Sequence, residues 1–276
     1  MRPYHDRMRS LAVALILLAA GCTSVEGSNR SQLNFYSMDQ DVALGRQVYE
    51  QELRGKNVLP SSDPRAQRVQ RIGNRIEAAS RKRHPAVANQ MEWVWTVVDE
   101  PGTVNAWMVP GGRAAVYTGM IDFAKSDDEL AVVMGHEAAH AIARHGTERA
   151  SQGALVSTGV QVAGAASGEP AVGQGAAVAA MLGITLPFSR FQESEADDLG
   201  LLIAAQAGYD PRTAIDLWGR MQSRGGGSVE FLSTHPSEDT RLERLQRLMP
   251  QAAAIYQRAS EGAPPSAPRA GVPRSR

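Results

Sequence analysis

Three of the six histidines of this 276-residue chain lie within the segment GHEAAHAIARHG, residues 135–146. An α-helix advances about 100° per residue, so His136 and His140 would share one face and His145 would point to the other side. Glu137 directly follows the first histidine and completes an H-E-x-x-H pattern. In this pattern two imidazoles bind Zn²⁺ and the carboxylate handles the proton of a metal-bound water. We therefore expect one Zn²⁺ per chain, held in part by His136 and His140, with Glu137 as the general base.

The sequence around the motif is typical of a buried helix. Ser126 followed by Glu129 predicts a capping box at its start, and residues 130–143 are apolar almost all round. Such a helix packs in the core, where polar side chains need partners, and a metal ion would supply them. Gly146 is a stop signal. We expect His145 at the surface or near the helix end, where its positive charge would suit the helix dipole.

A third ligand is needed, and a third histidine within the same motif is excluded. The extended pattern H-E-x-x-H-x-x-G-x-x-H requires glycine at position 143 and histidine at 146, where this chain has Ala143 and Gly146. A glutamate from a second helix is the other common solution.

The best source of that glutamate is the segment FSRFQESEADDLG, residues 188–200. Ser189 and Gln192 form a second capping box, which predicts a helix start. Glu193 and Asp197 are four residues apart and share a face, and Glu195 points roughly the other way. We expect Glu193 to complete the metal site and Asp197 to support a ligand histidine. The alternative is a solvated acidic helix start.

H-E-x-x-H followed by S-R-x-x-E-x-x-A-D resembles the HtpX, BepA and CAAX-prenyl-protease family of zinc peptidases. NAWMVPGGRAAVYTGM, residues 105–120, is similar to the strand and turn that precede the zinc helix in that family. STHPSEDTR, residues 233–241, is similar to a segment of its BepA-like periplasmic branch. The resemblance extends from about residue 40 to 250, without the helical-repeat domain of some relatives. It implies a gluzincin-type endopeptidase with Glu137 as base and with ligands His136, His140 and Glu193.

Two residues of the last segment are further candidates for the site. His235 would either donate a hydrogen bond to the tetrahedral intermediate or fill the open zinc position and hold the enzyme latent. The resemblance favours the second role, and a histidine before proline in a surface loop is the alternative without function. Arg241 is the arginine of the same segment. With Asp197, it is expected to support the metal ligands without binding the metal itself.

The stretch RAAVYT, residues 113–118, follows a Pro-Gly-Gly turn and predicts an edge strand. It would belong to a small mixed sheet with MEWVWTVVDE, residues 91–100. An exposed edge beside the metal would bind an extended polypeptide through main-chain hydrogen bonds. Ala114 and Val116 are therefore predicted to contact substrate.

The N-terminus is typical of a secretion signal. Three arginines precede the apolar run LAVALILLAAG, which is too short to span a membrane. The lone Cys22 follows Ala-Ala-Gly and resembles the lipidated cysteine of bacterial lipoproteins, with plain secretion as the alternative. We expect a signal peptide at 1–21 and a polar tether at 22–38 that joins the protein to the membrane through its lipid anchor. Thr23 favours the bacterial outer membrane, with the protein on its periplasmic face.

Residues 39–250 are expected to form one α+β domain that is mostly helical, with the small sheet beside the H-E-x-x-H helix. A Gly- and Ala-rich insertion at 151–188 would form a helical hairpin, and residues 251–276 would be a largely disordered tail. Lys and Arg total 29, as do Asp and Glu, so no nucleic-acid-binding patch is indicated.

These features favour a zinc endopeptidase of the bacterial envelope that cleaves misfolded or misassembled proteins. A non-proteolytic zinc lipoprotein that acts as a chaperone or assembly partner is the rival. Glu137 speaks against it, because a structural zinc site has no use for a base beside its ligand. Amide hydrolysis in peptidoglycan would use similar chemistry, but an edge strand suits polypeptide better than glycan.

Overall fold

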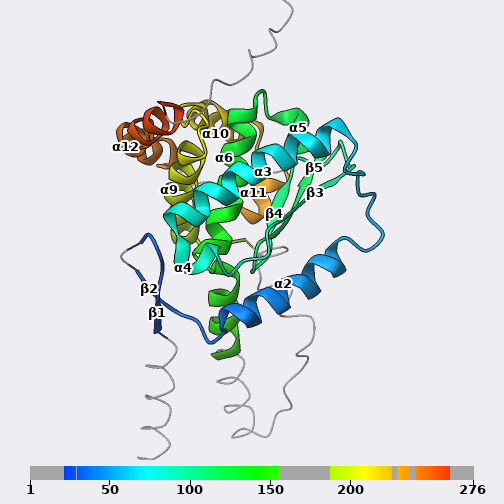
Figure 1. The fold of residues 1–276 in the computed structure, drawn as a ribbon, viewed down its shortest axis with the longest axis vertical. Coiled ribbons are helices and arrows are strands. Elements are labelled where there is room, and N and C mark those ends of the chain that lie inside the picture. Colours follow the sequence, from blue (N-terminus) through cyan, green and yellow to red (C-terminus); the bar gives the residue numbers. More distant parts are fainter. Residues whose placement is uncertain (1–21, 29, 156–186, 226–228, 237–239, 262–276) are drawn as a thin grey trace, which may run out of the picture.

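The computed structural model describes residues 22–28, 30–155, 187–225, 229–236 and 240–261 (Figure 1). Residues 145–155 form a helix without a label in Figure 1. The labelled elements, in chain order, are β1 (Cys22–Ser24), β2 (Ser31–Leu33), α2 (Met38–Glu52), α3 (Pro64–Arg83), α4 (Pro85–Ala88), β3 (Val94–Val98), β4 (Ala106–Met108), β5 (Arg113–Tyr117), α5 (Thr118–Phe123), α6 (Asp127–Ile142), α9 (Arg190–Gln206), α10 (Thr213–Arg224), α11 (Phe231–Thr234) and α12 (Arg241–Glu261).

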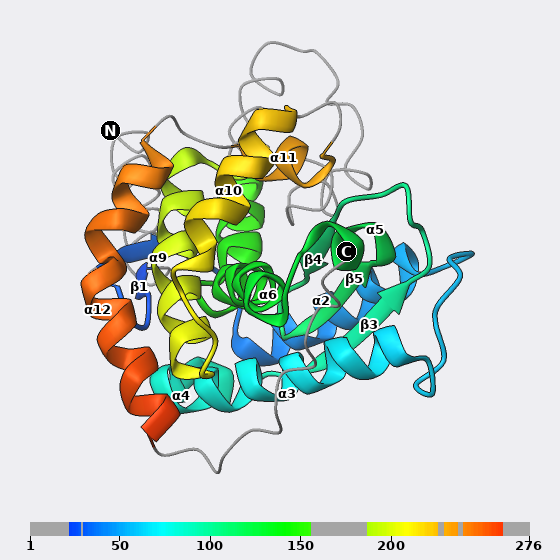
Figure 2. The same cartoon turned by 90° about the horizontal axis from the view of Figure 1, so that it is seen from above.

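Helix α6 carries the H-E-x-x-H motif through the centre of the molecule. Figure 2 shows it end-on, between α9 and α10 on one side and the sheet on the other. Every residue from Glu129 to Ile142 is buried, as its apolar surface predicts. At its start the Glu129 N–H donates to Ser126 Oγ (3.1 Å), but the Glu129 carboxylate accepts from the Lys125 N–H instead of closing a reciprocal capping box.

Helix α9 crosses α6 where each helix has a glycine. A Cβ on Gly135 would lie 2.7 Å from the Gly200 carbonyl oxygen, and a Cβ on Gly200 would lie 2.7 Å from the His136 nitrogen. Only glycine permits this approach of two backbones. The predicted capping box of Ser189 and Gln192 is present at the start of α9. The close crossing therefore fixes the distance between the two helices that carry the predicted ligands.

The fold is mostly helical with a small mixed sheet, as predicted. The strand order is β3-β5-β4, in which β3 is parallel and β4 antiparallel to β5. The prediction that residues 113–118 form an edge strand is wrong, because β5 is the central strand and both of its neighbours take its backbone hydrogen bonds. Ala114 and Val116 are each 1% exposed, so they pack in the core and do not face a substrate. The free edge beside α6 belongs to β4.

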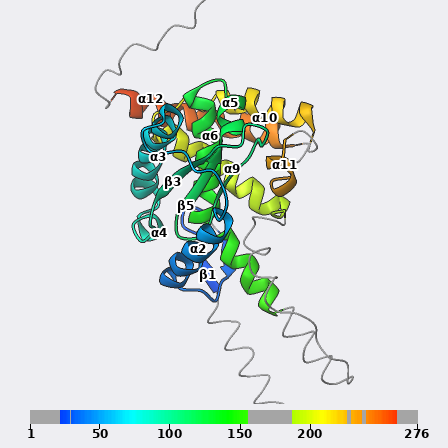
Figure 3. The ribbon, with the colours of Figure 1, turned by 90° about the vertical axis from the view of Figure 1, so that its right-hand side faces the viewer.

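The predicted polar tether at 22–38 is wrong as well. Strands β1 and β2 form an antiparallel hairpin, and Val25, Gln32 and Asn34 are buried. Arg30, between the strands, forms ion pairs with Glu148 and Glu195. Figure 3 shows the hairpin and α2 at the same end of the molecule. Buried polar side chains with specific partners explain why a segment of tether-like composition is ordered.

The C-terminal boundary at 250 falls inside helix α12, which continues to Glu261 and buries Ala252 and Ile255 against the domain. Residues 151–155 of the predicted insertion extend the helix that begins at 145. Residues 156–186 and 262–276 lie outside the described residues. Within the described part of the chain, no helix has the length and apolarity needed to cross a membrane.

Candidate active site

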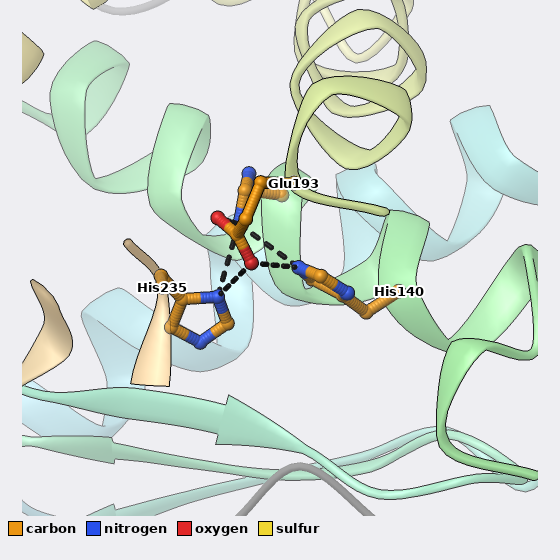
Figure 4. A group of neighbouring side chains, drawn as sticks. His140, Glu193 and His235 are labelled. Atoms are coloured by element: carbon orange, nitrogen blue, oxygen red, sulfur yellow. Dashed lines mark hydrogen bonds and ion pairs between the residues drawn. The ribbon is translucent and has the colours of Figure 1, made fainter. Parts of the chain in front are cut away.

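Four buried side chains from three helical segments converge at the centre of the fold. His136 and His140 come from α6, Glu193 from the first turn of α9, and His235 directly follows α11. One potential ligand atom of each lies within 4.8 Å of the others. Each of the four residues is at most 3% exposed. Figure 4 shows His140, Glu193 and His235 pointing toward a common centre.

The spacing of these atoms fits a tetrahedral zinc ion. Nε2 of His136 and Nε2 of His140 are 3.1 Å apart, and Nδ1 of His235 lies 3.3 Å from the former. Oε1 of Glu193 lies 3.0 Å from Nδ1 of His235 and 3.4 Å from Nε2 of His140. Ligands bonded to Zn²⁺ at about 2.0–2.1 Å in a tetrahedron are ~3.4 Å apart. Three imidazoles and one carboxylate are also a donor set that zinc accepts.

The electrostatics of the cluster favour a cation. Burial lowers the pKa of His136, but hydrogen bonds with Asp197 and Glu193 override it and raise the pKa to about 9. Burial raises the pKa of Glu193, but the surrounding histidines, His235 foremost, bring it well below its usual value. Burial holds the pKa of His140 well below its usual value, which leaves a neutral imidazole able to ligate. Among the described residues, Oε2 of Glu193 has no hydrogen-bond partner.

Glu137 lies beside the cluster without belonging to it. Its Oε1 is 3.5 Å from Nε2 of His235 and lacks a hydrogen-bond partner within the described part of the chain. Burial is the largest influence and raises the pKa of the Glu137 carboxyl above its usual value, although His235 and His136 lower it. A buried carboxylate with a raised pKa and a free oxygen is suited to accept and return a proton.

Nδ1 of His136, on the side away from the ligand cluster, contacts Asp197 directly. Oδ1 of Asp197 lies 3.0 Å from that nitrogen, and the Arg241 guanidinium donates to the same oxygen at 2.6 Å. The guanidinium carbon of Arg241 is 3.6 Å from the ring centroid of Trp218. Burial raises the pKa of Asp197, but Arg241 and His136 lower it below its usual value. The structure thus places both predicted supporting residues behind His136.

His145 was expected at the surface or near the helix end. It lies three residues after the end of α6, but it is fully buried and not at the surface. Its Nδ1 is 2.9 Å from Nδ1 of His140, and its Nε2 is 2.9 Å from Oε2 of Glu195. Counting 100° per residue fails because α6 ends at Ile142 and the chain turns before His145. Arg144 adopts a left-handed backbone conformation (φ 58°) and pairs with Asp41, whose carboxylate is buried. A left-handed residue just past a helix end is a common C-cap, here without glycine.

Two aromatic residues at the site escaped the sequence analysis. The Phe188 ring stacks on His140, with centroids 4.0 Å apart, and Phe231 stacks on His235 at 4.2 Å. In the sequence, Phe188 is marked only by its position just before a predicted helix start, and Phe231 only by its position shortly before His235. Cys22 lies in β1 of the hairpin, and its lipidation stays a prediction.

The side chains of the cluster are buried, and the described part of the chain leaves little room beside them. A cavity of about 10 Å³, lined in part by Met108, His140 and Phe188, borders the cluster. This is room for about one water molecule. A polypeptide therefore reaches these residues only after part of the surrounding structure moves.

Comparisons with known proteins agree with this chemistry. The model of Peptidase family M48 matches residues 63–249. The mitochondrial metalloendopeptidase OMA1 of Schizosaccharomyces pombe is 35% identical over 230 residues, which cover 82% of this chain and 66% of that protein. OMA1 of Saccharomyces cerevisiae is 30% identical over 88% of this chain and 76% of its own length. The beta-barrel assembly-enhancing protease of Yersinia pestis is 26% identical, over 80% of this chain and 47% of its own length.

These relatives contradict the expected location in a bacterial outer membrane. The two yeast proteins, at 30–35% identity, are named mitochondrial, and the match to the bacterial assembly-enhancing protease is weaker. The expectation rested on Thr23 after a lipobox-like cysteine. A short basic and apolar leader resembles targeting signals of more than one kind, so it does not fix a compartment by itself.

The family match spans residues 63–249 of 276 and includes all four residues of the cluster, so this chain belongs to peptidase family M48, the HExxH zinc metallopeptidases.

Proposed function

We propose that this chain is an endopeptidase that cleaves extended segments of misfolded or misassembled proteins. The observation that carries the proposal is the position of Glu137, a buried base that contacts His235 of the metal cluster and accepts a backbone hydrogen bond from Met108 of β4. A structural zinc site would have no use for such a base.

One edge of β4 pairs with no other strand among the described residues, and a polypeptide could pair with it. The Asn105 carbonyl and the Val109 N–H bond to β5 (3.1 and 2.9 Å). Because hydrogen bonding alternates along an antiparallel pair, the backbone groups of Val104, Ala106 and Met108 face the opposite edge. A backbone hydrogen bond from Met108 reaches the Glu137 carboxylate. A polypeptide paired with this edge would therefore pass next to the base, and main-chain pairing gives broad specificity.

The chemistry then divides between the metal and the protein. His136, His140 and Glu193 would hold the zinc ion, which would supply a more acidic water molecule and a Lewis acid for the scissile carbonyl. Glu137 takes the proton of that water and delivers it to the leaving amine. Its raised pKa favours the first of these steps, because the carboxylate of a weaker acid accepts a proton more readily.

We also propose that His235 keeps the enzyme latent by occupying the fourth ligand position. Its Nδ1 is 3.3 Å from Nε2 of His136 and 3.0 Å from Oε1 of Glu193, as a fourth ligand requires. In this conformation His235 therefore lies where a fourth ligand would lie. This position favours the latent role of His235 over a hydrogen bond from it to the tetrahedral intermediate.

The segment that carries His235 also covers the free edge of β4. The Phe231 N–H donates to the Val104 carbonyl (3.1 Å), one of the groups on that edge. The Phe188 N–H donates to the Thr234 carbonyl (3.0 Å) and ties this segment to the start of α9. Displacement of α11 and His235 would therefore free a zinc position and a peptide-binding edge together.

The test of the proposal is casein cleavage by the zinc-loaded parent and by Glu137→Gln. The variant should retain zinc and lose activity by at least about 100-fold, since general-base catalysis contributes 10²–10⁴-fold. Glu92→Gln, at an exposed ion pair, is the matched control and should remain as active as the parent. Undiminished cleavage by Glu137→Gln would contradict the assignment of the base.

His235→Ala separates the two roles of that histidine. Removal of a blocking ligand raises the rate of casein cleavage while zinc remains bound by the other three residues. Loss of cleavage with zinc retained would instead support the hydrogen-bonding role.

A further inference from the structure

His140 has a neighbour that the H-E-x-x-H motif does not account for. Its Nε2 faces the ligand cluster, and its Nδ1 lies 2.9 Å from Nδ1 of His145. His145 in turn places its Nε2 2.9 Å from Oε2 of Glu195. On its Nδ1 side His140 therefore contacts no carboxylate among the described residues, and His145 lies between it and Glu195.

With both imidazoles neutral, the donors and acceptors along this chain of contacts can be arranged in only one way. Glu195 is ion-paired with Arg30 (2.8 Å), so its carboxylate only accepts hydrogen bonds. His145 must donate to it from Nε2, which leaves Nδ1 of the neutral ring as an acceptor. His140 must then donate from Nδ1, and the lone pair of its Nε2 points to the metal position.

We call the contacts from His140 through His145 to Glu195 the relay. Arg30 of the N-terminal hairpin contacts its last residue, Glu195. The Arg30 guanidinium contacts Glu195 and also Glu148. Glu148 accepts in turn from the amide of Gln192 (2.8 Å), three residues after the N-cap of α9. All of these side chains are largely buried, so each depends on its partners in the network.

We propose that His145, held by Glu195 and Arg30, is a positioning residue that fixes the tautomer and orientation of His140. The hairpin of residues 22–33 thereby becomes part of the support of the metal site, through Arg30. The inference rests on the metal site of the proposed function, and it is independent of the substrate and of the role of His235.

The test measures zinc affinity by competition with a chromophoric chelator, on the full folded chain. His145→Leu removes the acceptor at similar volume and should weaken zinc binding by about 10- to 100-fold, as loss of such partners typically does. His145→Asn places Oδ1 where Nδ1 stood and should recover most of the affinity. His84→Leu is the matched control, since His84 is equally buried and has no hydrogen-bond partner among the described residues. It should bind zinc like the parent.

A second readout separates positioning from general stability. The melting temperature of each variant is measured with and without zinc, because the stabilisation by a bound ligand increases with the logarithm of its affinity. A positioning role makes the zinc-dependent increment of His145→Leu smaller than that of the parent. A merely structural role lowers both melting temperatures equally and leaves the increment unchanged, which would overturn the proposal.

Arg30→Met examines the far end of the relay, with Arg46→Met at an exposed ion pair as control. The first should weaken zinc binding by several-fold and the second should leave it unchanged. If the parent binds zinc and both His145→Leu and Arg30→Met match its affinity, this inference is wrong and the metal site stands. If the parent binds no zinc, the proposed function itself fails.

Discussion

The two metal-binding histidines of α6 are supported in different ways. His136 contacts a carboxylate directly, since Asp197 lies 3.0 Å from its Nδ1 and is held by Arg241. His140 contacts a histidine, and the carboxylate follows one step later. Both arrangements leave Nε2 free for the metal. The difference lies in where the supporting residues come from.

Asp197, which supports His136, lies on the helix that also carries the third ligand, one turn after Glu193. The relay behind His140 draws on the N-terminal hairpin, the turn after α6 and α9. The support of His136 can therefore be predicted from helical periodicity. The support of His140 depends on contacts between segments that are distant in the sequence. Substitutions can remove each of these two supports separately.

The largest effect is expected from Glu193→Ala compared with Glu195→Ala, two changes on the same helix. The first removes a ligand, so native mass spectrometry should show the zinc ion lost. The second leaves all ligands in place, and zinc should remain bound with reduced affinity. It also leaves Arg30 and His145 without their buried partner, which costs about 3–5 kcal/mol of unfolding free energy. Full zinc retention in Glu193→Ala would contradict the assignment of the third ligand.

Asp197→Ala should reduce zinc affinity by about 10- to 100-fold through loss of the direct support of His136. Arg241 is 4% exposed and would become a buried charge without its partner, so the unfolding free energy should also fall, by about 3–5 kcal/mol. Chelator competition and urea denaturation measure the two effects. An affinity equal to that of the parent would mean that His136 needs no carboxylate.

The double variant Asp197→Ala and His145→Leu tests whether the two supports act independently. Each acts on its own ligand, so their effects on the free energy of zinc binding should add to within about 0.5 kcal/mol. A coupling clearly above that value would show that the two histidines are positioned as one unit. The double-mutant cycle, with zinc affinity as its observable, measures the coupling.

The smallest effect is expected in how the free energy of unfolding depends on pH, through the Glu195 carboxyl group. Hydrogen bonds from His145 and Arg30 outweigh burial and lower the pKa of Glu195 to about 2, from an ordinary 4.5. A depressed carboxyl pKa contributes stability that is complete above pH 4.5 and is lost as pH falls toward 2. Urea denaturation of the metal-free parent and Glu195→Gln should therefore show the largest difference above pH 4.5 and a shrinking one below it. A constant difference would contradict this carboxylate's role.

The sequence was sufficient where local rules apply. Helix α9 begins at the predicted capping box of Ser189 and Gln192, and α6 is buried all round as its composition indicates. The spacing of His136 and His140 placed both side chains on one face, and the structure brings them together with Glu193. Each of these inferences needs only helical periodicity and a cap.

The sequence was insufficient where distant segments meet. Strand β5 was expected at the edge because a turn precedes it, but strand order depends on where β3 and β4 pair. His145 was misplaced because nothing local announced the left-handed turn at Arg144, which an ion pair with Asp41 accompanies. The N-terminal hairpin looked like a tether because its partners, on α9 and in the helix after α6, lie more than 100 residues away in the sequence.

The most direct test of the account is anomalous X-ray diffraction at the zinc edge on crystals of the zinc-loaded parent. We predict one anomalous peak, about 2.0–2.1 Å from the ligand atoms of His136, His140 and Glu193 and from Nδ1 of His235. A hydrogen bond between the Nδ1 atoms of His140 and His145 should persist in the same crystals. A peak elsewhere, or one without Glu193 among its ligands, would contradict the site on which the whole account rests.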